Sequence, residues 1–231
     1  MSDGPDPALL SMTWEDTLFA HWPVPPERVA ATLPDDLSVD THEGDAYLGV
    51  VAFVMASIGP RGLPVGLSFG ELNLRTYVRD RDGRDGVYFY NLDADDRVGV
   101  FLARQLFKLP YYRARIDVDR NGEVRFRSRR VGEGAPASFD ATYGPAGEPF
   151  EADPGSRPHF LTERYRFYTA TDDGRLYYGD IDHGPWPLAE AHADIRRNDL
   201  FAVNGFDRPD GDPVLHYAAH VDVTAGPIRR V

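Results

Sequence analysis

The chain of 231 residues contains no cysteine. Disulfide bonds, zinc sites built on thiolates and cysteine nucleophiles are therefore excluded. Lysine is almost as scarce, because of the 25 basic residues all but Lys108 are arginines. Any reaction that needs a lysine amine can use only this one side chain.

Segments that direct secretion or span a bilayer are also lacking. The first residues, "MSDGPDPALLSM", have neither the basic region nor the apolar region of a signal peptide. The longest apolar run, "YLGVVAFVMASIG", is too short to cross a bilayer and predicts a buried strand. We therefore expect a cytoplasmic protein with no membrane partner.

Positive charge is in deficit, since the formal net charge is −12 and the acids comprise 27 Asp and 10 Glu. Such a surface repels nucleic acid and anionic membranes, so neither is expected as a partner. An Asp-rich, Lys-poor chain suits a salt-adapted, halophilic cytoplasm. GC-rich codon usage would also replace Lys by Arg, but it leaves the acid excess unexplained, so salt adaptation is the favoured interpretation.

Many short segments separated by turn residues predict a fold dominated by strands. Hydrophobic residues make up 42% of the chain, and there are 22 Gly and 19 Pro. Residues 75–92 and 164–181 each place aromatic and β-branched runs on both sides of an Asp-Gly pair, as hairpins do. We predict an α+β protein, mostly antiparallel sheet, forming one domain over residues 1–231 with residues 1–12 as a flexible lead.

The register of one hairpin, within residues 112–129, follows from its alternation. A three-residue loop over residues 120–122 pairs Val118 with Val124, so apolar side chains share one face. A two-residue turn would set apolar residues opposite charged ones. The longer loop is therefore predicted, with Gly122 in the left-handed conformation.

Three short helices are expected. Residues 25–34 begin with a proline pair, and residues 96–108 have near-helical apolar spacing that Pro110 ends. Residues 187–205 form a third, with Gly205 as its C-cap. This third helix would carry His192 and Asp194 on its solvated face.

The histidines offer little support for a metal site, and no metal or other cofactor is expected. His216 and His220 alternate with apolar residues as in a strand, where four residues cover about 13 Å, too far for one ion. His183 lies beside Asp180 and Asp182 and could act as a general base or a ligand. A histidine in a turn is the preferred interpretation.

Glu71 is the most informative carboxylate, because it falls within the apolar stretch "LSFGELNL". Burial would raise its pKa and make it a candidate site residue. A position at the end of an exposed strand explains the pattern equally well. Phosphate loops, nucleophile elbows and dinucleotide fingerprints are absent from the sequence.

Several segments, in order from Trp14 onward, resemble the YqjF-like family, the domain of unknown function 2071. They include "GELNLRTYV", "VYFYNLDADDRVGVFLARQLFKLPYY", "HFLTERYRFYT" and "HGPWPL". That family is similar, more distantly, to acetoacetate decarboxylase. The resemblance implies a cone or barrel of curved antiparallel strands enclosing a pocket, and it implies no settled activity.

The decarboxylase pattern tests this resemblance at the residues that carry its chemistry. In that family one lysine forms a Schiff base, and a second lysine lowers the pKa of the first. The two lysine positions fall here on Tyr111 and Tyr112, while Lys108 lies three residues earlier. Glu71 matches the family's pocket glutamate, and Trp14 falls where the decarboxylases have a pocket arginine.

The resemblance therefore implies a small-molecule pocket, for an organic acid, without Schiff-base chemistry. Glu71 would be its polar anchor or proton acceptor, and Tyr111 and Tyr112 would line its wall. Arg104 would pair with Glu71, bind a ligand carboxylate or pack on the helix surface. Binding and catalysis both remain open, as does the oligomeric state. One alternative is a lysine-dependent decarboxylase or aldolase using Lys108. Another is a structural or interaction protein whose cone is filled by Tyr111, Tyr112 and Trp14.

Overall fold

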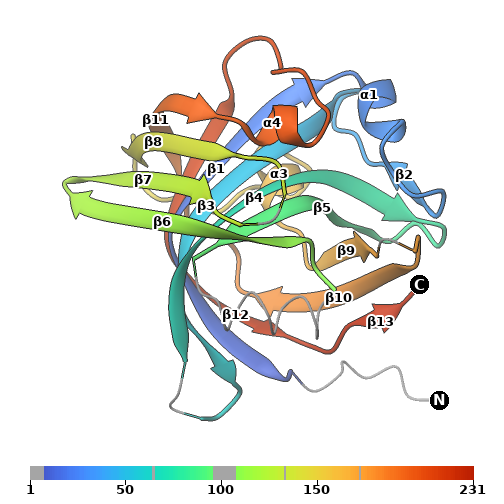
Figure 1. The fold of residues 1–231 in the computed structure, drawn as a ribbon, viewed down its shortest axis with the longest axis horizontal. Helices are drawn as coiled ribbons and strands as arrows, with labels where there is room; N and C mark the ends of the chain where they lie inside the picture. Colours follow the sequence, from blue (N-terminus) through green and yellow to red (C-terminus); the bar gives the residue numbers. More distant parts are fainter. Residues whose placement is uncertain (1–7, 64–65, 96–107, 133, 172) are drawn as a thin grey trace.

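The computed structural model describes residues 8–63, 66–95, 108–132, 134–171 and 173–231. These residues form one curved sheet with a few short helices at its margins, which confirms the predicted α+β class (Figure 1). The helices are α1 (Pro26–Ala30), α3 (Arg157–Thr162) and α4 (Leu200–Val203). The strands are β1 (Leu10–Val24), β2 (Leu37–Val39), β3 (Ala46–Pro60), β4 (Leu67–Asp80), β5 (Asp85–Ala94), β6 (Tyr111–Asn121), β7 (Glu123–Arg130), β8 (Ser138–Pro145), β9 (Arg166–Ala170), β10 (Leu176–His183), β11 (Leu188–Asn198), β12 (Val214–Ala225) and β13 (Arg229–Arg230).

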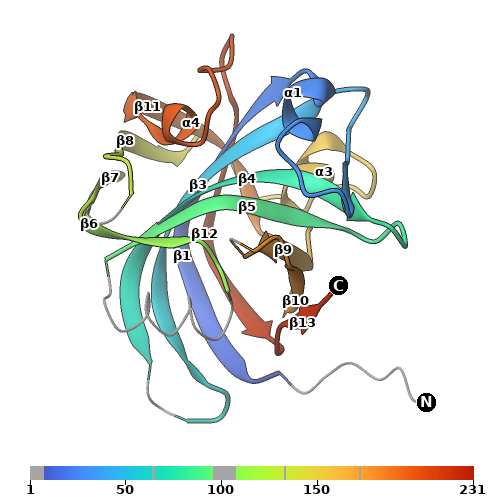
Figure 2. The same ribbon diagram turned by 45° about the vertical axis from the view of Figure 1, so that its right-hand side comes forward.

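The sheet closes on itself twice. Strands β12, β1, β3, β4 and β5 lie side by side and form a shared wall. From β5 the sheet continues through β6, β7, β8 and β11 back to β12, which closes a nine-stranded ring among the described residues. From β5 it also continues through β9 and β10 to β12, which closes a seven-stranded ring (Figure 2). Neighbouring strands are antiparallel, except that β5 runs parallel to β6 and β9.

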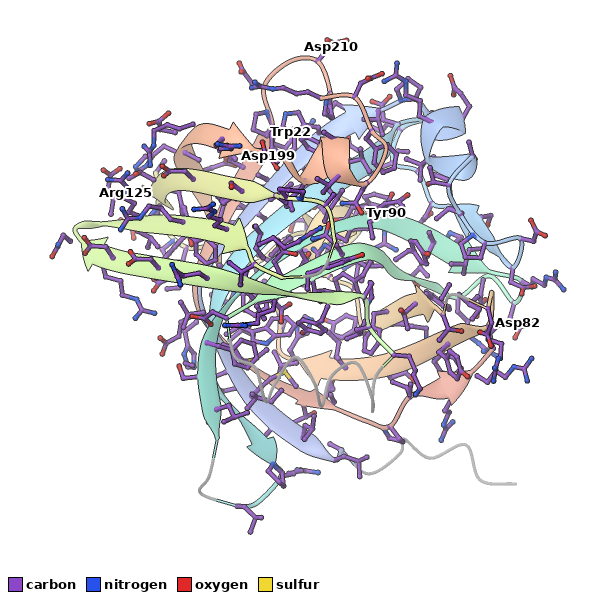
Figure 3. The ribbon with its side chains drawn as sticks, viewed as in Figure 1. Trp22, Asp82, Tyr90, Arg125, Asp199 and Asp210 are labelled. Carbon is purple, nitrogen blue, oxygen red and sulfur yellow. The ribbon has the colours of Figure 1, made fainter. Side chains whose placement is uncertain are left out.

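The nine-stranded ring is filled by a hydrophobic core, called here the filled core. Figure 3 labels Trp22 and Tyr90 in this upper part of the molecule, whereas Arg125 lies at its edge. Each fully buried aliphatic or aromatic side chain contributes about 1.5–3 kcal/mol to stability. The filled core includes Leu18, Ala20, Trp22, Leu48, Val50, Leu72, Leu74, Phe126, Phe139, Tyr143 and Leu200.

A β-bulge in β1 changes which residues of that strand face each ring. The register with β3 shifts between Glu15 and Leu18, and Asp16 has a φ of 52°. Two tyrosines fix the bulge, because the Tyr143 hydroxyl donates to the Asp16 carbonyl at 2.8 Å and the Tyr217 hydroxyl to Asp16 Oδ1 at 2.6 Å. A bulge of this kind re-aims the side chains beyond it.

Of the predicted helices, that at residues 25–34 is confirmed by α1. The third was wrong over most of its length, since residues 188–198 form β11, which carries His192 and Asp194 and pairs with β8. Its partly buried Ala191, Ala193 and Ile195 alternate along the strand and pack on the filled core, which a helix could not reproduce. Only α4 is helical, and Gly205 follows it with a φ of 79°. The predicted helix at residues 96–108 lies outside the described residues, except for Lys108.

The hairpin of β6 and β7 has the predicted face but not the predicted register. Val118 pairs with Phe126 rather than with Val124, a shift of two residues. An even shift keeps every side chain on its face, so the alternation of apolar residues could not distinguish the two registers. Gly122 is left-handed as predicted, with a φ of 86°.

The N-terminal lead is shorter than expected. β1 begins at Leu10, which pairs with Ala225 of β12 and Pro60 of β3. Residues 10–12 are therefore part of the shared wall rather than a flexible segment, because strands on both sides hold them. Among the described residues, no helix has the length and apolar character needed to cross a membrane.

Candidate functional site

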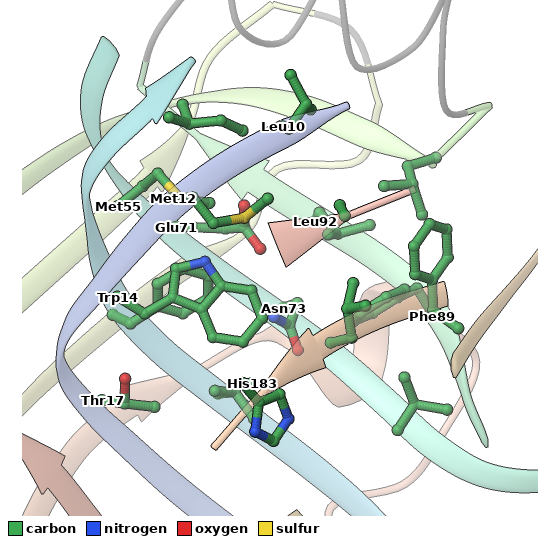
Figure 4. Close-up of a pocket in the computed structure, with 18 of the residues that line it drawn as sticks. Leu10, Met12, Trp14, Thr17, Met55, Glu71, Asn73, Phe89, Leu92 and His183 are labelled. Atoms are coloured by element: carbon green, nitrogen blue, oxygen red, sulfur yellow. The ribbon is translucent and has the colours of Figure 1, made fainter. Parts of the chain in front are cut away.

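The seven-stranded ring encloses a cavity of about 520 Å³. Figure 4 shows part of its wall, where Met12, Trp14, Glu71, Asn73 and His183 surround a common space. Most lining side chains are aliphatic or aromatic, and the volume is in the range of small-molecule sites. The described residues thus leave the ring partly empty, in contrast to the filled core on the other side of the shared wall.

Strand β4 brings a row of polar side chains to this cavity. Glu71, Asn73 and Arg75 alternate along the strand and all line the cavity. The intervening Leu72 and Leu74 are buried in the filled core. Successive strand residues face opposite sides, so one short segment serves both rings with different chemistry.

Glu71 and Tyr111 form the central polar pair of the cavity. The Tyr111 hydroxyl donates to Glu71 Oε2 at 2.6 Å, and Glu71 is only 4% exposed. Burial raises the pKa of Glu71 to about 7, against the opposing effects of hydrogen bonds from Tyr111 and Asn73. Burial, followed by the charge of Glu71, holds the pKa of Tyr111 well above its usual value. At neutral pH the Glu71 carboxyl can therefore either hold or accept a proton.

Aromatic side chains line the cavity beside the polar row of β4. Trp14 stacks on Trp186 with 5.8 Å between ring centroids and lies 5.1 Å from Phe53. His183 packs its ring edge against Trp186, and its Nδ1 lies 2.7 Å from the Gly184 carbonyl. Because a carbonyl oxygen only accepts, a proton on Nδ1 donates to it. These aromatic side chains offer a mostly apolar surface that also carries the indole Nε1 atoms of Trp14 and Trp186.

Arg75 lies at the other end of the polar row, where α3 closes the cavity. Its Nη2 donates to the Leu161 carbonyl at 3.1 Å, and its Cζ lies 5.5 Å from the Phe19 ring centroid. Nearby, the Tyr77 hydroxyl also donates to Leu161 at 2.6 Å and lies 2.6 Å from His21 Nε2. Burial, followed by the charge of Arg75, holds the pKa of His21 well below its usual value, so this histidine is neutral.

The candidate residues predicted from the sequence are divided by the fold. Glu71, Tyr111 and Trp14 all line the cavity. Tyr112 does not, because it is the next residue along β6 and so faces the other side. Its ring stacks against the guanidinium of Arg130, whose Cζ lies 3.9 Å from the ring centroid. The expectation that Tyr112 lines the pocket was therefore wrong.

The two basic candidates are not part of the described cavity wall. Arg104 lies outside the described residues. Lys108 has a φ of 53°, and its carbonyl accepts a hydrogen bond from Thr169 Oγ1 at 2.9 Å. The next residue, Leu109, lines the cavity, whereas Lys108 is not among the described residues that do. The Lys108 amine is thus not placed in the wall with Glu71.

The histidines singled out from the sequence, His183, His192, His216 and His220, all lie in strands. His216 and His220 are both in β12, as their alternation predicted, and His216 is buried while His220 is exposed. No cluster of three or more potential metal ligands occurs in the part of the chain that the structure describes. His183 ends β10 and faces the cavity, so the preferred interpretation as a turn histidine was wrong.

Sequence reasoning missed Asn73 and Arg75. The signal was present in "ELNLR", where polar residues alternate with leucines. Alternation of this kind ordinarily indicates a strand with one face in solvent. Here both faces are buried, since Glu71 is 4%, Asn73 3% and Arg75 9% exposed, so the polar face must belong to an internal site.

Two comparisons by sequence identify relatives of this chain. The model of the family DUF2071, described as an uncharacterized conserved protein, matches residues 11–222. The chain belongs to this family. Uncharacterized protein YqjF of Bacillus subtilis (strain 168) is similar to the DUF2071 chain, with 42% identity over 226 residues, covering 96% of this chain and 92% of the relative.

Solved structures similar to this DUF2071 chain share its fold at low identity. The enduracididine biosynthesis enzyme MppR complexed with pyruvate has a TM-score of 0.67 at 14% identity, covering 99% of this chain and 92% of that one. Acetoacetate decarboxylase from Legionella pneumophila has a TM-score of 0.66 at 14% identity, covering 100% and 92%. The fold of this DUF2071 protein is therefore acetoacetate decarboxylase-like.

Proposed function

We propose that this DUF2071 protein binds a small organic acid in the cavity of the seven-stranded ring, without forming a Schiff base. The observation that carries the proposal is the Glu71–Tyr111 pair, whose 2.6 Å hydrogen bond lies within a mostly apolar wall. A buried carboxyl that is partly protonated at neutral pH can accept or donate a hydrogen bond. It can therefore orient an oxygen-bearing ligand.

Unpartnered polar atoms in the wall support a ligand with several hydrogen-bonding groups. Trp14 Nε1, Thr17 Oγ1, Asn73 Oδ1 and Trp186 Nε1 are buried without a hydrogen-bond partner among the described residues. Buried polar groups are almost always paired with protein, water or ligand. Their gathering on the residues that line one cavity favours a site that a bound molecule completes.

The acid class is supported by the neighbouring fold. One structural neighbour is complexed with pyruvate, and others are acetoacetate decarboxylases. At 14% identity these neighbours share the fold, and fold alone does not fix the chemistry of a site. The two lysine positions of the decarboxylase pattern fall on Tyr111 and Tyr112 in this chain. The proposal therefore keeps recognition of the acid and omits Schiff-base formation.

The first experiment is borohydride trapping with acetoacetate and pyruvate, followed by intact mass and peptide mapping. Lys108 is the chain's single lysine, so it and the N-terminal amine are the primary amines to be mapped. We expect no adduct on Lys108. An adduct that disappears in Lys108→Arg would replace the proposal with the lysine-dependent decarboxylase or aldolase.

Binding itself is measured by titrating the same acids, and longer ones, while following tryptophan fluorescence and heat. Trp14 and Trp186 line the cavity, whereas Trp22 belongs to the filled core. A saturable change that is absent in Trp14→Phe but kept in Trp22→Phe would locate the ligand in the cavity. Absence of any saturable signal across the acids would contradict the proposed function and favour an interaction role.

A second candidate function, proton transfer, is favoured by the pKa of Glu71. A general base works best when its pKa is near the working pH, and burial sets that of Glu71 to about 7. Exchange of the α-hydrogens of a bound 2-oxo acid into D₂O, followed by NMR, tests this role. Exchange that is at least tenfold slower in Glu71→Gln would identify an enzyme, and equal rates would leave binding alone.

A further inference from the structure

We propose that Arg75 is the carboxylate anchor of the cavity and that the ligand is an elongated, amphipathic organic acid. Its carboxylate would pair with Arg75 at the α3 end, and its apolar body would lie along the aromatic wall toward Glu71. This inference rests on the proposed function and narrows it, because it names both the charge and the length of the acid. It differs from the short keto acids suggested by the structural neighbours.

Arg75 is a buried cation without a counter-ion among the described residues. The side chain lines the cavity, its residue is 9% exposed, and no described carboxylate lies within ion-pair distance. Its Nη2 donates to the Leu161 carbonyl at 3.1 Å and to the Tyr77 hydroxyl at 3.5 Å. Its Nε is buried with no partner among the described residues. A guanidinium has five N–H donors, so several remain for a ligand.

The groups packed around Arg75 do not neutralise it. Phe19 contributes a ring face, Leu161 a carbonyl, and Tyr77 a hydroxyl whose pKa is raised by burial. His21 is neutral, because burial and the Arg75 charge lower its pKa. Burying a charge without a counter-ion costs free energy, and buried charges in proteins are ordinarily paired with an opposite charge. An anionic group on a ligand supplies the missing partner.

The other arginines of the cavity serve as an internal comparison. Arg164 pairs with Asp40 at 2.9 Å and with Asp85 at 2.7 Å. Arg166 pairs with Asp180 at 2.6 Å. The charges of Arg164 and Arg166 are therefore already balanced by aspartates. Arg75 differs from them in presenting its charge to the cavity itself, where a planar guanidinium can hold a carboxylate through two parallel hydrogen bonds.

Distance along β4 sets the length of the acid. Glu71 and Arg75 are four residues apart, so their Cα atoms are separated by about 13 Å. The Arg75 guanidinium lies toward Tyr77, on the side away from Glu71, with Cζ 5.8 Å from the tyrosine ring centroid. Pyruvate and acetoacetate carry their carboxylate and keto groups too close together to reach both residues. An extended chain of about six to eight carbon atoms would span them.

The space between the two anchors suits an apolar body. Phe19, Val51, Phe53 and Trp186 line it, and they belong to one buried cluster. Burial of the apolar chain here would favour binding, while the carboxylate would gain hydrogen bonds at Arg75. A cavity of about 520 Å³ has room for such a chain.

The test compares octanoate with octanamide, which has the same chain without the charge, and with acetate and pyruvate. Binding to the full-length protein is measured by calorimetry and by the fluorescence of Trp14 and Trp186. We expect octanoate to bind at least tenfold more tightly than octanamide and at least tenfold more tightly than acetate or pyruvate. Arg75→Gln should weaken octanoate at least tenfold and leave octanamide within twofold. Arg115→Gln, at an exposed position on β6, is the matched control and should change neither.

Different failures have different meanings. If octanamide binds as tightly as octanoate, or if Arg75→Gln leaves the preference for the acid intact, the Arg75 anchor is overturned while a binding cavity stands. If neither octanoate nor octanamide binds while pyruvate or acetate does, this inference is overturned and the proposed function stands. If none of the four ligands binds, the proposed function fails and this inference fails with it. If Arg75→Gln does not fold, as judged by circular dichroism, Arg75→Lys decides instead. That variant keeps the charge and should keep a preference for octanoate over octanamide. Equal binding of octanoate and octanamide by folded Arg75→Lys would overturn the anchor.

Discussion

The two rings of this protein share five strands and differ in what they enclose. On one face of the shared wall the strands present Leu18, Val50, Leu72 and Leu74 to the filled core. On the other face β4 presents Glu71, Asn73 and Arg75 to a cavity of about 520 Å³. Both faces are buried, so burial alone does not distinguish a core from a site. The chemistry of the alternating residues does.

The closing strands explain why one ring is full and the other is not. The nine-stranded ring is closed by β6, β7, β8 and β11, which bring large inward side chains such as Phe126, Phe139 and Tyr143. The seven-stranded ring is closed by β9 and β10. Glycine at position 179 of β10 lies against the ring of Phe167, at 2.4 Å from where a Cβ would be. A side chain at position 179 would therefore clash with Phe167, which itself lines the cavity.

The largest expected effect comes from truncating a phenylalanine in each ring. Phe126→Ala should lower the free energy of unfolding by about 3–5 kcal/mol, because it empties a fully packed site. Phe53→Ala should cost about 1–3 kcal/mol, because part of its ring already borders the cavity. Urea unfolding of the two variants measures the difference. Equal losses would show that the cavity is closed in solution.

The next largest effect is a pH dependence of the free energy of unfolding that arises from Glu71 in the cavity. The folded-state pKa of Glu71 is about 7, and the unfolded value is near 4.5. Below pH 4.5 the carboxyl is protonated in both states. As pH rises to 7 the unfolded chain releases this proton first, so the wild type should lose about 3 kcal/mol relative to Glu71→Gln. Urea unfolding of both proteins between pH 4 and 8 measures this difference, and a difference that is constant with pH would place Glu71 in contact with water.

The smallest effect probes the bulge that separates the two faces of β1. Tyr217→Phe removes the 2.6 Å hydrogen bond to Asp16 Oδ1 and should cost about 1–2 kcal/mol. Because the bulge also aims Trp14 and Thr17 into the cavity, the fluorescence of Trp14 should shift as well. Tyr143→Phe removes the bond to the Asp16 carbonyl and serves as the companion variant. Unchanged stability and unchanged fluorescence in both would show that β1 keeps its bulge without these tyrosines.

Local patterns in the sequence predicted which side of a strand each residue faces better than they predicted how that strand pairs with its neighbours. The alternation around Val118 gave the correct face, yet an even shift of register left that face unchanged. Residues 188–198 alternate alanine and isoleucine with polar residues, and short alanine-rich stretches of this kind are compatible with either a helix or a strand. Packing against the filled core decided in favour of a strand.

The candidate site was predicted in part. Glu71, Tyr111 and Trp14 could be chosen because the family resemblance and the apolar surroundings of Glu71 pointed to them. Arg75 could not, because its importance depends on a counter-ion that is missing in three dimensions. Tyr111 points into the cavity, and Tyr112 is the next residue of the same strand. Strand geometry therefore turns Tyr112 to the other side of the sheet.

The position of β12 near the end of the chain has a consequence for how the protein folds during synthesis. This strand closes both rings, and it pairs with β1, so that Leu10 meets Ala225 and Tyr217 reaches Asp16 across 201 positions. Contacts this distant along the chain are made late and slow folding. During synthesis, β1 to β5 would leave the ribosome with β1 exposed as an unpaired edge long before its partner exists. Neither the filled core nor the cavity can be completed until nearly the whole chain has left the ribosome. We therefore expect folding of this topology to depend on chaperones.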